Sequence, residues 1–292
     1  KTMAAFRLPE KTRVGHVVLG VTSLAESLAF WKDLLGFRAE TAEEGKAALL
    51  FPQTGEEWVA MLREDSRLPK ASGCTGLYHL AVRLPSRKHL GSLLRRLADA
   101  GVPLEGLSDH GVSEALYLEA PDGLGVEVYI DRPREAWTFS RGQIIMVTKP
   151  LESRKLLAEG EETPWTGMPE GTAAGHIHLQ VSNLDKAKAF YSGHVGLTVT
   201  QKGYPGALFF AAGDYHHHVG TNIWDSRNAK GAPAGTAGLR SFSLVLPSQE
   251  DVEALRTRTL QSGLPLEALP HAPAGFATRD TDRIIVGFEA LA

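Results

Sequence analysis

The chain has 292 residues, enough for two domains of about 150 residues or for one large domain. Hydrophobic residues make up 43% of the chain and charged residues 22%, a globular composition that excludes disordered and fibrous proteins. With 31 Lys and Arg against 34 Asp and Glu, the formal net charge is -3, so we expect no nucleic-acid partner.

Cysteine use and hydropathy indicate the compartment. The single cysteine, Cys74, cannot form a disulfide within the chain, and the sequence has no apolar run of the signal-peptide type. No hydrophobic stretch approaches the roughly 20 residues that a membrane span needs, because Gly, Pro or charged residues interrupt each run. We therefore expect a soluble, cytoplasmic protein without a membrane partner; the oligomeric state stays open.

The sequence repeats itself. The segment that starts at Gly15 parallels the segment that starts at Gly175, 160 residues later, and both begin with Gly-His. The segment that starts with Leu-Pro-Ser at Leu84 parallels the one at Leu246, 162 residues later. The two halves are therefore duplicates.

Each half divides again into two units. Each unit starts with a short alternating strand and a helix of about four turns that ends at Gly, and continues with three short strands. Ser23 and Ser248 precede acidic residues at the spacing of helix N-terminal caps. The expected helix stops are Gly36, Gly101, Gly196 and Gly263.

The predicted fold class is α+β, with four tandem βαβββ modules. The expected divisions are a first module pair in residues 1–131, a linker with a short helix near Leu151–Leu157 in residues 132–174, and a second module pair in residues 175–292. The expected bounds of the four units are about 13–63, 76–130, 175–224 and 238–290.

Four such units resemble the vicinal oxygen chelate superfamily, which includes glyoxalases, bleomycin resistance proteins and type I extradiol dioxygenases. The resemblance is carried by the Gly-His strands and by the runs FWKDLLGF and FYSGHVGL, and it covers nearly the whole chain. It implies that two units pair into a curved half-barrel sheet whose concave face holds a divalent metal.

Strand alternation shows which side chains would line that concave face. In the second unit, His79 lies opposite the apolar face of the strand HLAVRL, and Glu127 and Tyr129 do the same in LGVEVYI. The matching strands of the first and fourth units, WVAML and IIVGF, carry no ligand-type side chain. We therefore interpret the first and fourth units as a structural pair.

A ferrous centre for oxygen chemistry suits two imidazoles and one carboxylate, because three positions then stay open for a chelating substrate and O2. His79 and Glu127 meet two of these requirements. The third ligand is His16 if consecutive units pair, or His176 if the second unit pairs with the third. We favour His176, because the His216-His217-His218 cluster would then line the same cavity. Fe(II) is the expected metal, with Mn(II) as an alternative.

The segment ahead of Glu127 resembles that of extradiol dioxygenases. Residues 108–113, Tyr117 and the Pro-Asp-Gly at 121–123 are similar to the family's run of Asn-Asp-His, Ser, Tyr and Pro-Ser-Gly, with two more residues after the serine. The resemblance implies that Tyr117, ten residues before the carboxylate, contacts the substrate.

The resemblance also implies a function, that of a catechol 2,3-dioxygenase-like extradiol enzyme with an aromatic diol and O2 as its small-molecule partners. His110 or His218 would act as acid and base, and Tyr117 would hydrogen-bond a substrate or oxygen atom. Arg83 would either offset the charge of an anionic substrate or form a salt bridge.

Two alternatives remain within the same fold. A glyoxalase-type isomerase usually holds its metal with four protein ligands, and the fourth position would fall near Val219 or Gly220. A drug-binding resistance protein would bind its ligand without a metal.

Overall fold

The computed structural model describes residues 6–291, and the duplication organises its elements. The first unit contains β1 (Arg13–Val21), α1 (Leu24–Leu28), the π-helical η1 (Ala29–Leu34), β2 (Arg38–Ala42), the 3-10 turn η2 (Glu43–Gly45), β3 (Ala47–Phe51) and β4 (Ala60–Glu64). The second unit contains β5 (Gly76–Arg83), α2 (Arg87–Asp99), β6 (Gly106–Asp109), β7 (Ser113–Glu119) and β8 (Gly125–Asp131).

The linker and the second half follow. The linker contains the 3-10 turn η3 (Arg134–Ala136), β9 (Phe139–Ser140), β10 (Gln143–Ile144), β11 (Lys149–Pro150) and α3 (Ser153–Gly160). The third unit contains β12 (Ala173–Gln180), α4 (Leu184–Lys188), the π-helical η4 (Ala189–His194), β13 (Thr198–Gln201), β14 (Ala207–Ala211) and β15 (Val219–Asn222). The fourth contains β16 (Gly238–Leu246), α5 (Gln249–Gln261), β17 (Phe276–Arg279) and β18 (Ile285–Ala290).

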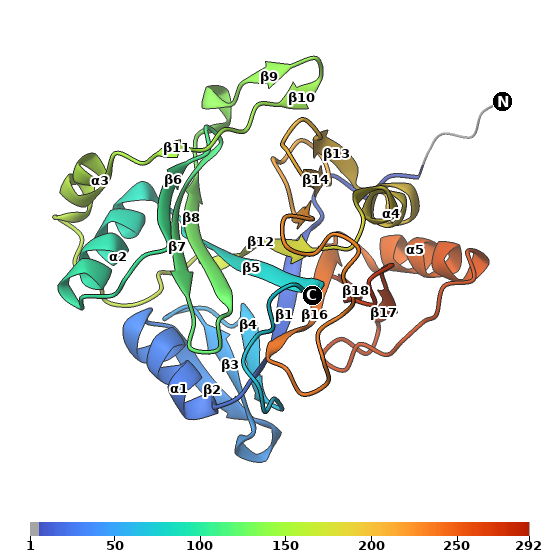
Figure 1. Cartoon of the computed structure of the whole chain (residues 1–292), viewed down its shortest axis with the longest axis horizontal. Helices are drawn as coiled ribbons and strands as arrows, with labels where there is room; N and C mark the ends of the chain where they lie inside the picture. Colours follow the sequence, from blue (N-terminus) through green and yellow to red (C-terminus); the bar gives the residue numbers. More distant parts are fainter. Residues whose placement is uncertain (1–5, 292) are drawn as a thin grey trace.

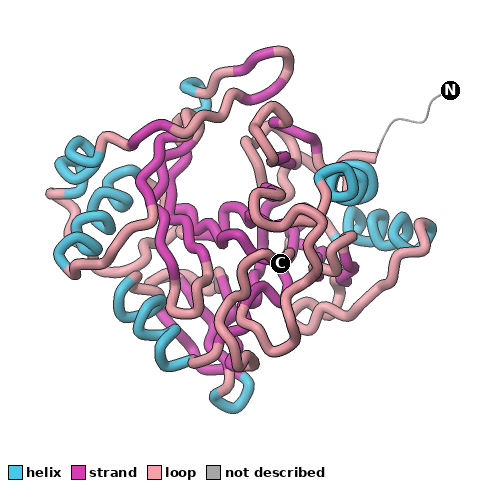
Figure 2. Tube along the Cα trace, in the orientation of Figure 1, coloured by secondary structure: helices cyan, strands magenta, loops and turns pink. Residues whose placement is uncertain are grey.

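Two large sheets result, and each combines one unit from each half. The nine-stranded sheet has the order β11-β6-β7-β8-β5-β12-β15-β14-β13, so the second unit pairs with the third. The seven-stranded sheet has the order β17-β18-β16-β1-β4-β3-β2, so the first unit pairs with the fourth. Strands fill the interior of the molecule and the helices lie at its periphery (Figure 1; Figure 2). These are the pairings that the sequence interpretation of the histidines favoured.

The predicted helix ends are confirmed. Ser23 and Ser248 accept hydrogen bonds from the backbone N–H groups of Glu26 and Asp251, respectively. The four stop glycines all have a positive φ, the left-handed conformation that ends a helix and that glycine adopts without a steric penalty.

The fourth unit and the linker depart from the expected pattern. In the fourth unit, the first of the three expected strands is reduced to a single bridge between Glu267 and Ala277. Pro265 and Pro270 flank this segment and lack the N–H donor that a longer ladder requires. In the linker, the helix expected near Leu151–Leu157 is α3, shifted toward the C-terminus.

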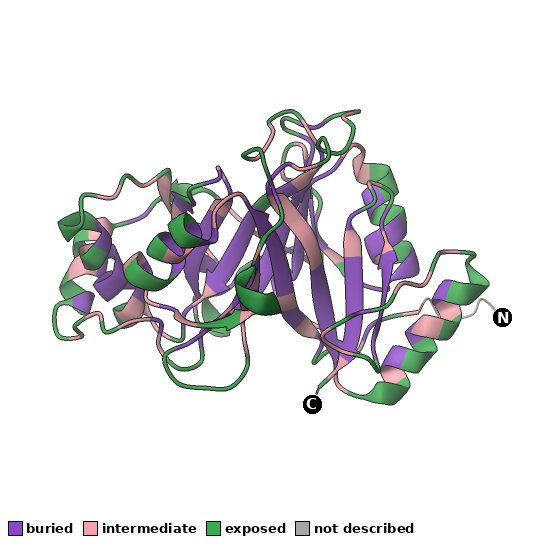
Figure 3. Ribbon diagram, turned by 90° about the horizontal axis from the view of Figure 1, so that it is seen from below, coloured by how far each residue is buried: buried purple, intermediate pink, exposed green. Residues whose placement is uncertain are grey.

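The hydrophobic core lies between the sheets and the helices. Alternation directs Leu80 and Val82 of β5 away from the concave face, where they are fully buried in one core cluster with Leu90 and Leu93 of α2. Figure 3 shows the strands buried along most of their length and the helices exposed on their outer side. The opposite strand faces are thereby left free to carry polar side chains.

Helix α3 fixes the linker against the second unit. It packs on α2 so closely that a Cβ atom on Gly91 would collide with the carbonyl oxygen of Leu156. None of the helices described within residues 6–291 has both the length and the apolar character required to cross a membrane.

Candidate functional site

Three side chains meet on the concave face of the nine-stranded sheet. His79 comes from β5, His176 from the adjacent β12, and Glu127 from β8 on the other side of β5. The Nε2 atom of His79 lies 2.9 Å from Oε2 of Glu127, and Nε2 of His176 lies 3.2 Å from the same oxygen. All three residues are buried, and one donor atom from each lies within 4.8 Å of the others.

The protonation states suit a metal. Burial opposes the charge of Glu127, but His176 and His79 hold the pKa of its carboxyl well below the usual range. Burial lowers the pKa of both imidazoles, although Glu127 opposes that shift. An ionised carboxylate and two neutral imidazoles are the forms in which these groups bind a divalent cation.

The hydrogen bonding of His79 tests whether a metal fits this site. Its Nε2 atom is buried and close to Glu127, yet the direction of the contact is not that of a hydrogen bond, and residues 6–291 offer it no other partner. A buried polar atom without a partner is costly. A divalent metal would give this nitrogen a partner, and the two imidazoles and one carboxylate, with donor atoms within 4.8 Å of one another, fit such an ion.

A cavity of about 490 Å³ opens over the triad. His79, Glu127 and His176 form part of its lining. Much of the remaining wall is apolar or aromatic, with Tyr78, Met146, Tyr204, Phe209 and Trp224 among its members. The structure thus places the candidate metal ligands at the wall of a space that can hold a small molecule.

Tyr117 and His110 lie side by side in this cavity. Tyr117 sits opposite Glu127 in the pairing of β7 with β8, and its hydroxyl lies 2.8 Å from Nε2 of His110. Burial, with the nearby charge of Glu127, raises the pKa of Tyr117 well above its ordinary value, so the phenol stays protonated. Nδ1 of His110 lies 2.7 Å from the carbonyl oxygen of Val147 and must donate to it.

The histidine cluster requires a correction. His217 lines the cavity, with its ring centroid 4.1 Å from that of His176, whereas His218 does not line it. Nδ1 of His218 accepts a hydrogen bond from the backbone of Ala212 instead. Alternation predicted His218 as the inward residue, but β15 begins only at Val219, so the pattern of a strand does not apply to the preceding histidines.

His217 ends a chain of hydrogen bonds that sequence reasoning missed. His216 lies 2.8 Å from Asp131 through Nε2 and 2.8 Å from Nδ1 of His217 through Nδ1. Burial opposes the charge of Asp131, but the hydrogen bond from His216 keeps the pKa of this carboxyl low, so it accepts the Nε2 proton. One proton lies between Nδ1 of His216 and Nδ1 of His217, and burial lowers the pKa of His217 well below its usual value, which leaves the His217 imidazole neutral with one unprotonated nitrogen.

The remaining polar residues have structural partners. Arg83 lies 3.5 Å from Asp131 and does not line the cavity, so the salt bridge is the alternative that the structure supports. His178 lies 3.2 Å from the side-chain amide of Asn222, and burial lowers its pKa well below the usual value. His16 lies on the other sheet, against Glu289 and His271, a cluster that the sequence interpretation also missed.

Comparison with known proteins establishes the family. The sequence model of the Glyoxalase/Bleomycin resistance protein/Dioxygenase superfamily matches residues 13–128 and 173–283. The chain belongs to this superfamily. The two matched ranges correspond to the two halves of the duplication, and the α+β fold with curved sheets is the one that the resemblance implied.

Two curated relatives are similar to this chain, and both are dioxygenases by name. The chain is 41% identical over 269 residues to the catechol-2,3-dioxygenase of Bacillus subtilis (strain 168), covering 88% of this chain and 91% of that protein. It is 32% identical over 138 residues to biphenyl-2,3-diol 1,2-dioxygenase 3 of Rhodococcus globerulus, covering 45% of this chain and 71% of that one.

Solved structures share the fold at lower identity. A Bacillus subtilis structure described as a dioxygenase aligns with a TM-score of 0.65 and 14% identity, covering 98% of this chain and 86% of that one. Glyoxalase I from Zea mays aligns with a TM-score of 0.59 and 14% identity, covering 95% and 92%. Both likenesses concern the fold alone.

Proposed function

We propose that the protein is an extradiol dioxygenase that cleaves a catechol-type ring with O2, using Fe(II) held by His79, Glu127 and His176. The observation that carries this proposal is the convergence of two neutral imidazoles and one carboxylate at the wall of a cavity. Such a set leaves open positions on a ferrous ion, the arrangement of non-haem iron oxygenases. The 41% identity to a catechol-2,3-dioxygenase supports the same reaction class.

When bound, iron would supply sites for the two oxygens of a catechol and for O2, and would offset the charge of the deprotonated diol. The protein's part is to hold three donors in fixed positions and to shield them from solvent. Burial of all three ligands in paired strands provides both.

The cavity walls favour a planar aromatic substrate. Tyr78 and Trp224 pack edge to face with ring centroids 5.3 Å apart, and Tyr204 lies 6.2 Å from the same indole. Aromatic rings gain from offset or edge-to-face contacts with one another. These side chains can therefore orient a catechol ring by its faces, while its hydroxyls point toward the triad.

Two residues of the cavity wall, His217 and Tyr117, would handle the protons of the substrate. His217, which burial keeps neutral, has one unprotonated ring nitrogen, which suits it to take a proton from a substrate hydroxyl. Tyr117, held protonated by burial, donates to Nε2 of His110 at rest, and its hydroxyl can turn this proton toward a developing oxygen anion.

Gly220 bears on the glyoxalase alternative. His178 pairs with Gly220 across the parallel strands, and a Cβ atom on that glycine would lie 3.1 Å from the His178 ring. A side chain at residue 220 would therefore press on the His178 ring, and Gly220 itself offers no ligand atom from a side chain. This position thus does not supply the fourth protein ligand that a glyoxalase-type centre usually carries.

The test is a single-turnover assay. The protein is loaded anaerobically with Fe(II), mixed with catechol and then exposed to O2, and both O2 uptake and the yellow ring-opened semialdehyde are measured. We expect one O2 consumed per product formed. Colourless mixtures without O2 uptake across several substituted catechols would defeat the proposal, and isomerisation of a glutathione hemithioacetal would favour the glyoxalase reaction.

A further inference from the structure

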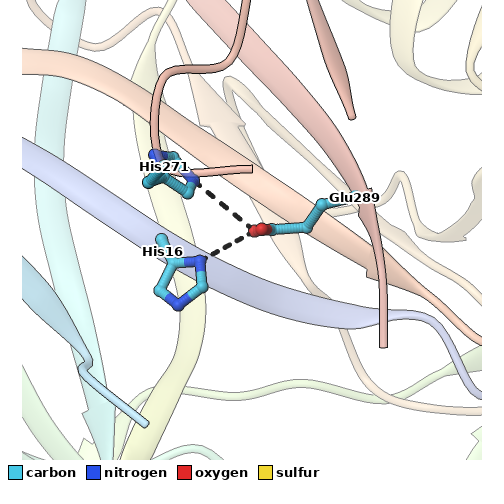
Figure 4. Close-up of side chains that lie close together, drawn as sticks. All are labelled: His16, His271 and Glu289. Atoms are coloured by element: carbon cyan, nitrogen blue, oxygen red, sulfur yellow. Dashed lines mark hydrogen bonds and ion pairs between the residues drawn. The ribbon is translucent and has the colours of Figure 1, made fainter. Parts of the chain in front are cut away.

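A second group of metal-binding side chains lies on the seven-stranded sheet, away from the proposed active site. Figure 4 shows His16, His271 and Glu289 directed toward one another. Nδ1 of His16 lies 2.9 Å and Nε2 of His271 3.7 Å from Oε1 of Glu289. The three donor atoms lie within 4.8 Å of one another, as in the first triad. The two groups have no residue in common.

The strand register shows that this group is not a copy of the first triad. His16 corresponds to His176, and Val18 pairs with Ser241 as His178 pairs with His79. Ser241 in turn pairs with Ile285 as His79 pairs with Gly125. Two residues farther along, the position of Glu127 is therefore held by Gly287.

The turn before β18 supports this alignment. Asp122 accepts a hydrogen bond from the backbone N–H of Thr22, and Asp282 accepts one from Ser182, residues that lie 160 positions apart in each case. Glu289 therefore corresponds to Tyr129. Glu289 is the next inward residue after Gly287 on β18, and His271 lies in a turn that has no counterpart in the first triad. The second group is therefore not the duplicated copy of the first.

The surroundings of Glu289 favour an occupant with positive charge. Its side chain is only 7% exposed, and within residues 6–291 no Lys or Arg forms an ion pair with it. Nε2 of His271 is buried and has no hydrogen-bond partner among the described residues. The absence of a Cβ atom on Gly15 leaves the space in which the Glu289 carboxylate and the Ser243 hydroxyl approach β1. A buried carboxylate without a fixed cation is costly.

We propose that His16, His271 and Glu289 form a second divalent metal site, of the zinc type, that stabilises the fold. Imidazole and carboxylate ligands suit zinc at about 2.0–2.2 Å, which separates neighbouring tetrahedral donors by roughly 3.3 Å, between the two separations to Glu289. Water would complete the coordination, because the Ser243 hydroxyl already donates to Glu289 and accepts from the backbone N–H of His16. The ligands come from β1, β18 and the turn before β17, so the metal ties the first and last strands and that turn together.

Trp58 encloses this site. Its ring stacks on His16 with centroids 4.0 Å apart and meets His271 edge on at 5.3 Å. The side chains of the two histidines are 16% and 14% exposed, so little room remains for a substrate beside the metal. These contacts assign the site to stability rather than to turnover.

The test counts zinc ions per chain. Chelator-stripped protein is titrated with Zn²⁺ alone, and bound metal is measured by calorimetry and by elemental analysis after dialysis. We expect two ions in the wild type, one in Glu127→Gln, one in His271→Ala, and none in the double variant. In Glu127→Gln, zinc at about 100 times its Kd should raise the melting temperature by about 5 °C, and the double variant should lose this rise.

The control is His89→Ala in the Glu127→Gln background, which removes a histidine of α2 and should still bind one ion. If circular dichroism shows that a His271 variant does not fold, His16→Ala is used instead. It removes another ligand of the same site, and the expected number of zinc ions per chain is unchanged. Two results would overturn the second site. One is that Glu127→Gln binds no zinc. The other is that Glu127→Gln still binds one ion after His271→Ala or His16→Ala is added. Because the readout is stoichiometry and melting, its failure says nothing about ring cleavage.

Discussion

The two sheets have the same strand arrangement and different inward side chains. In the nine-stranded sheet, the central β5 carries His79 and its parallel neighbour β8 carries Glu127. At the corresponding positions of the seven-stranded sheet stand Ser241 and Gly287. The fold therefore builds a concave face twice, but only one copy has donors at these two positions. Chemistry in this architecture is decided by a few inward residues, not by the sheet itself.

The largest expected effect comes from removing a ligand of the nine-stranded sheet. His176→Ala should lose bound iron and reduce kcat/KM by about 10³-fold or more, because charge neutralisation by a metal contributes several kcal/mol to the transition state. Iron content and O2 uptake are measured on the same preparations.

The matched control is the corresponding residue of the seven-stranded sheet. His16→Ala should keep the catalytic iron and ring cleavage, because β1 pairs with β16 and not with β5. Iron loss confined to His16→Ala would show that the ligand assignment is wrong and that the chemistry belongs to the other sheet.

A second comparison lies within the histidine cluster. His217→Asn should lower kcat by about 10²–10⁴-fold with iron retained, because it removes the imidazole base that lines the cavity. His218→Asn should change kcat only a few-fold, since its ring binds the backbone of Ala212. Equal losses in both variants, measured on iron-loaded enzyme, would contradict the assignment of His217 as the base.

Much of this organisation is readable from sequence. Alternation and duplication predict that His79 and Glu127 point inward. The last strands of the first and fourth units lack ligand-type side chains, and this predicts that these two units pair with each other. The predicted partner histidine, His176, then lies beside both, because β12 is the neighbour of β5. These inferences succeed because strands of regular length carry a strict period of two.

Irregular backbone defeats the same reasoning. The histidine triplet lies before β15 begins, so its facing could not be read from alternation, and the interpretation selected His218 in place of His217. His271 lies in a turn, and only the folded chain brings it to Glu289. Asp131, at the end of β8, joins the cluster through His216, a contact between residues 85 positions apart that no local pattern announces.

Tyr117 offers a smaller effect. Tyr117→Phe should reduce kcat by about 10²-fold while iron binding stays intact, because one hydrogen bond to a developing anion is lost. Tyr204→Phe is the matched control: it also removes a hydroxyl from the cavity, but that group lies 2.8 Å from Thr148, so a few-fold change is expected. Similar rates for Tyr117→Phe and the wild type would exclude the phenol from the chemistry.

The two halves also differ at one pair of buried positions outside both sites. In the first half, Trp31 and Ala120 occupy the places that Tyr191 and Asp280 hold 160 residues later. The backbone is alike, since Ala120 and Asp280 donate to the carbonyls of Leu124 and Ile284 at 2.9 and 3.0 Å. The second half thus has a buried Tyr–Asp pair, with 2.8 Å between hydroxyl and carboxylate, where the first is apolar.

This pair should make stability depend on pH without affecting turnover. Burial raises the pKa of Asp280 to about 6 from its ordinary 3.8, so the folded state keeps a proton that the unfolded state has released. The associated stability is complete below about pH 4 and is lost as pH rises through 6, a fall of about 1–3 kcal/mol. In urea unfolding, the difference between wild type and Asp280→Asn should shrink or reverse across this window. Tyr191→Phe removes a hydrogen bond to the charged form and should steepen the slope; parallel pH curves for all three proteins would show that Asp280 stays ionised.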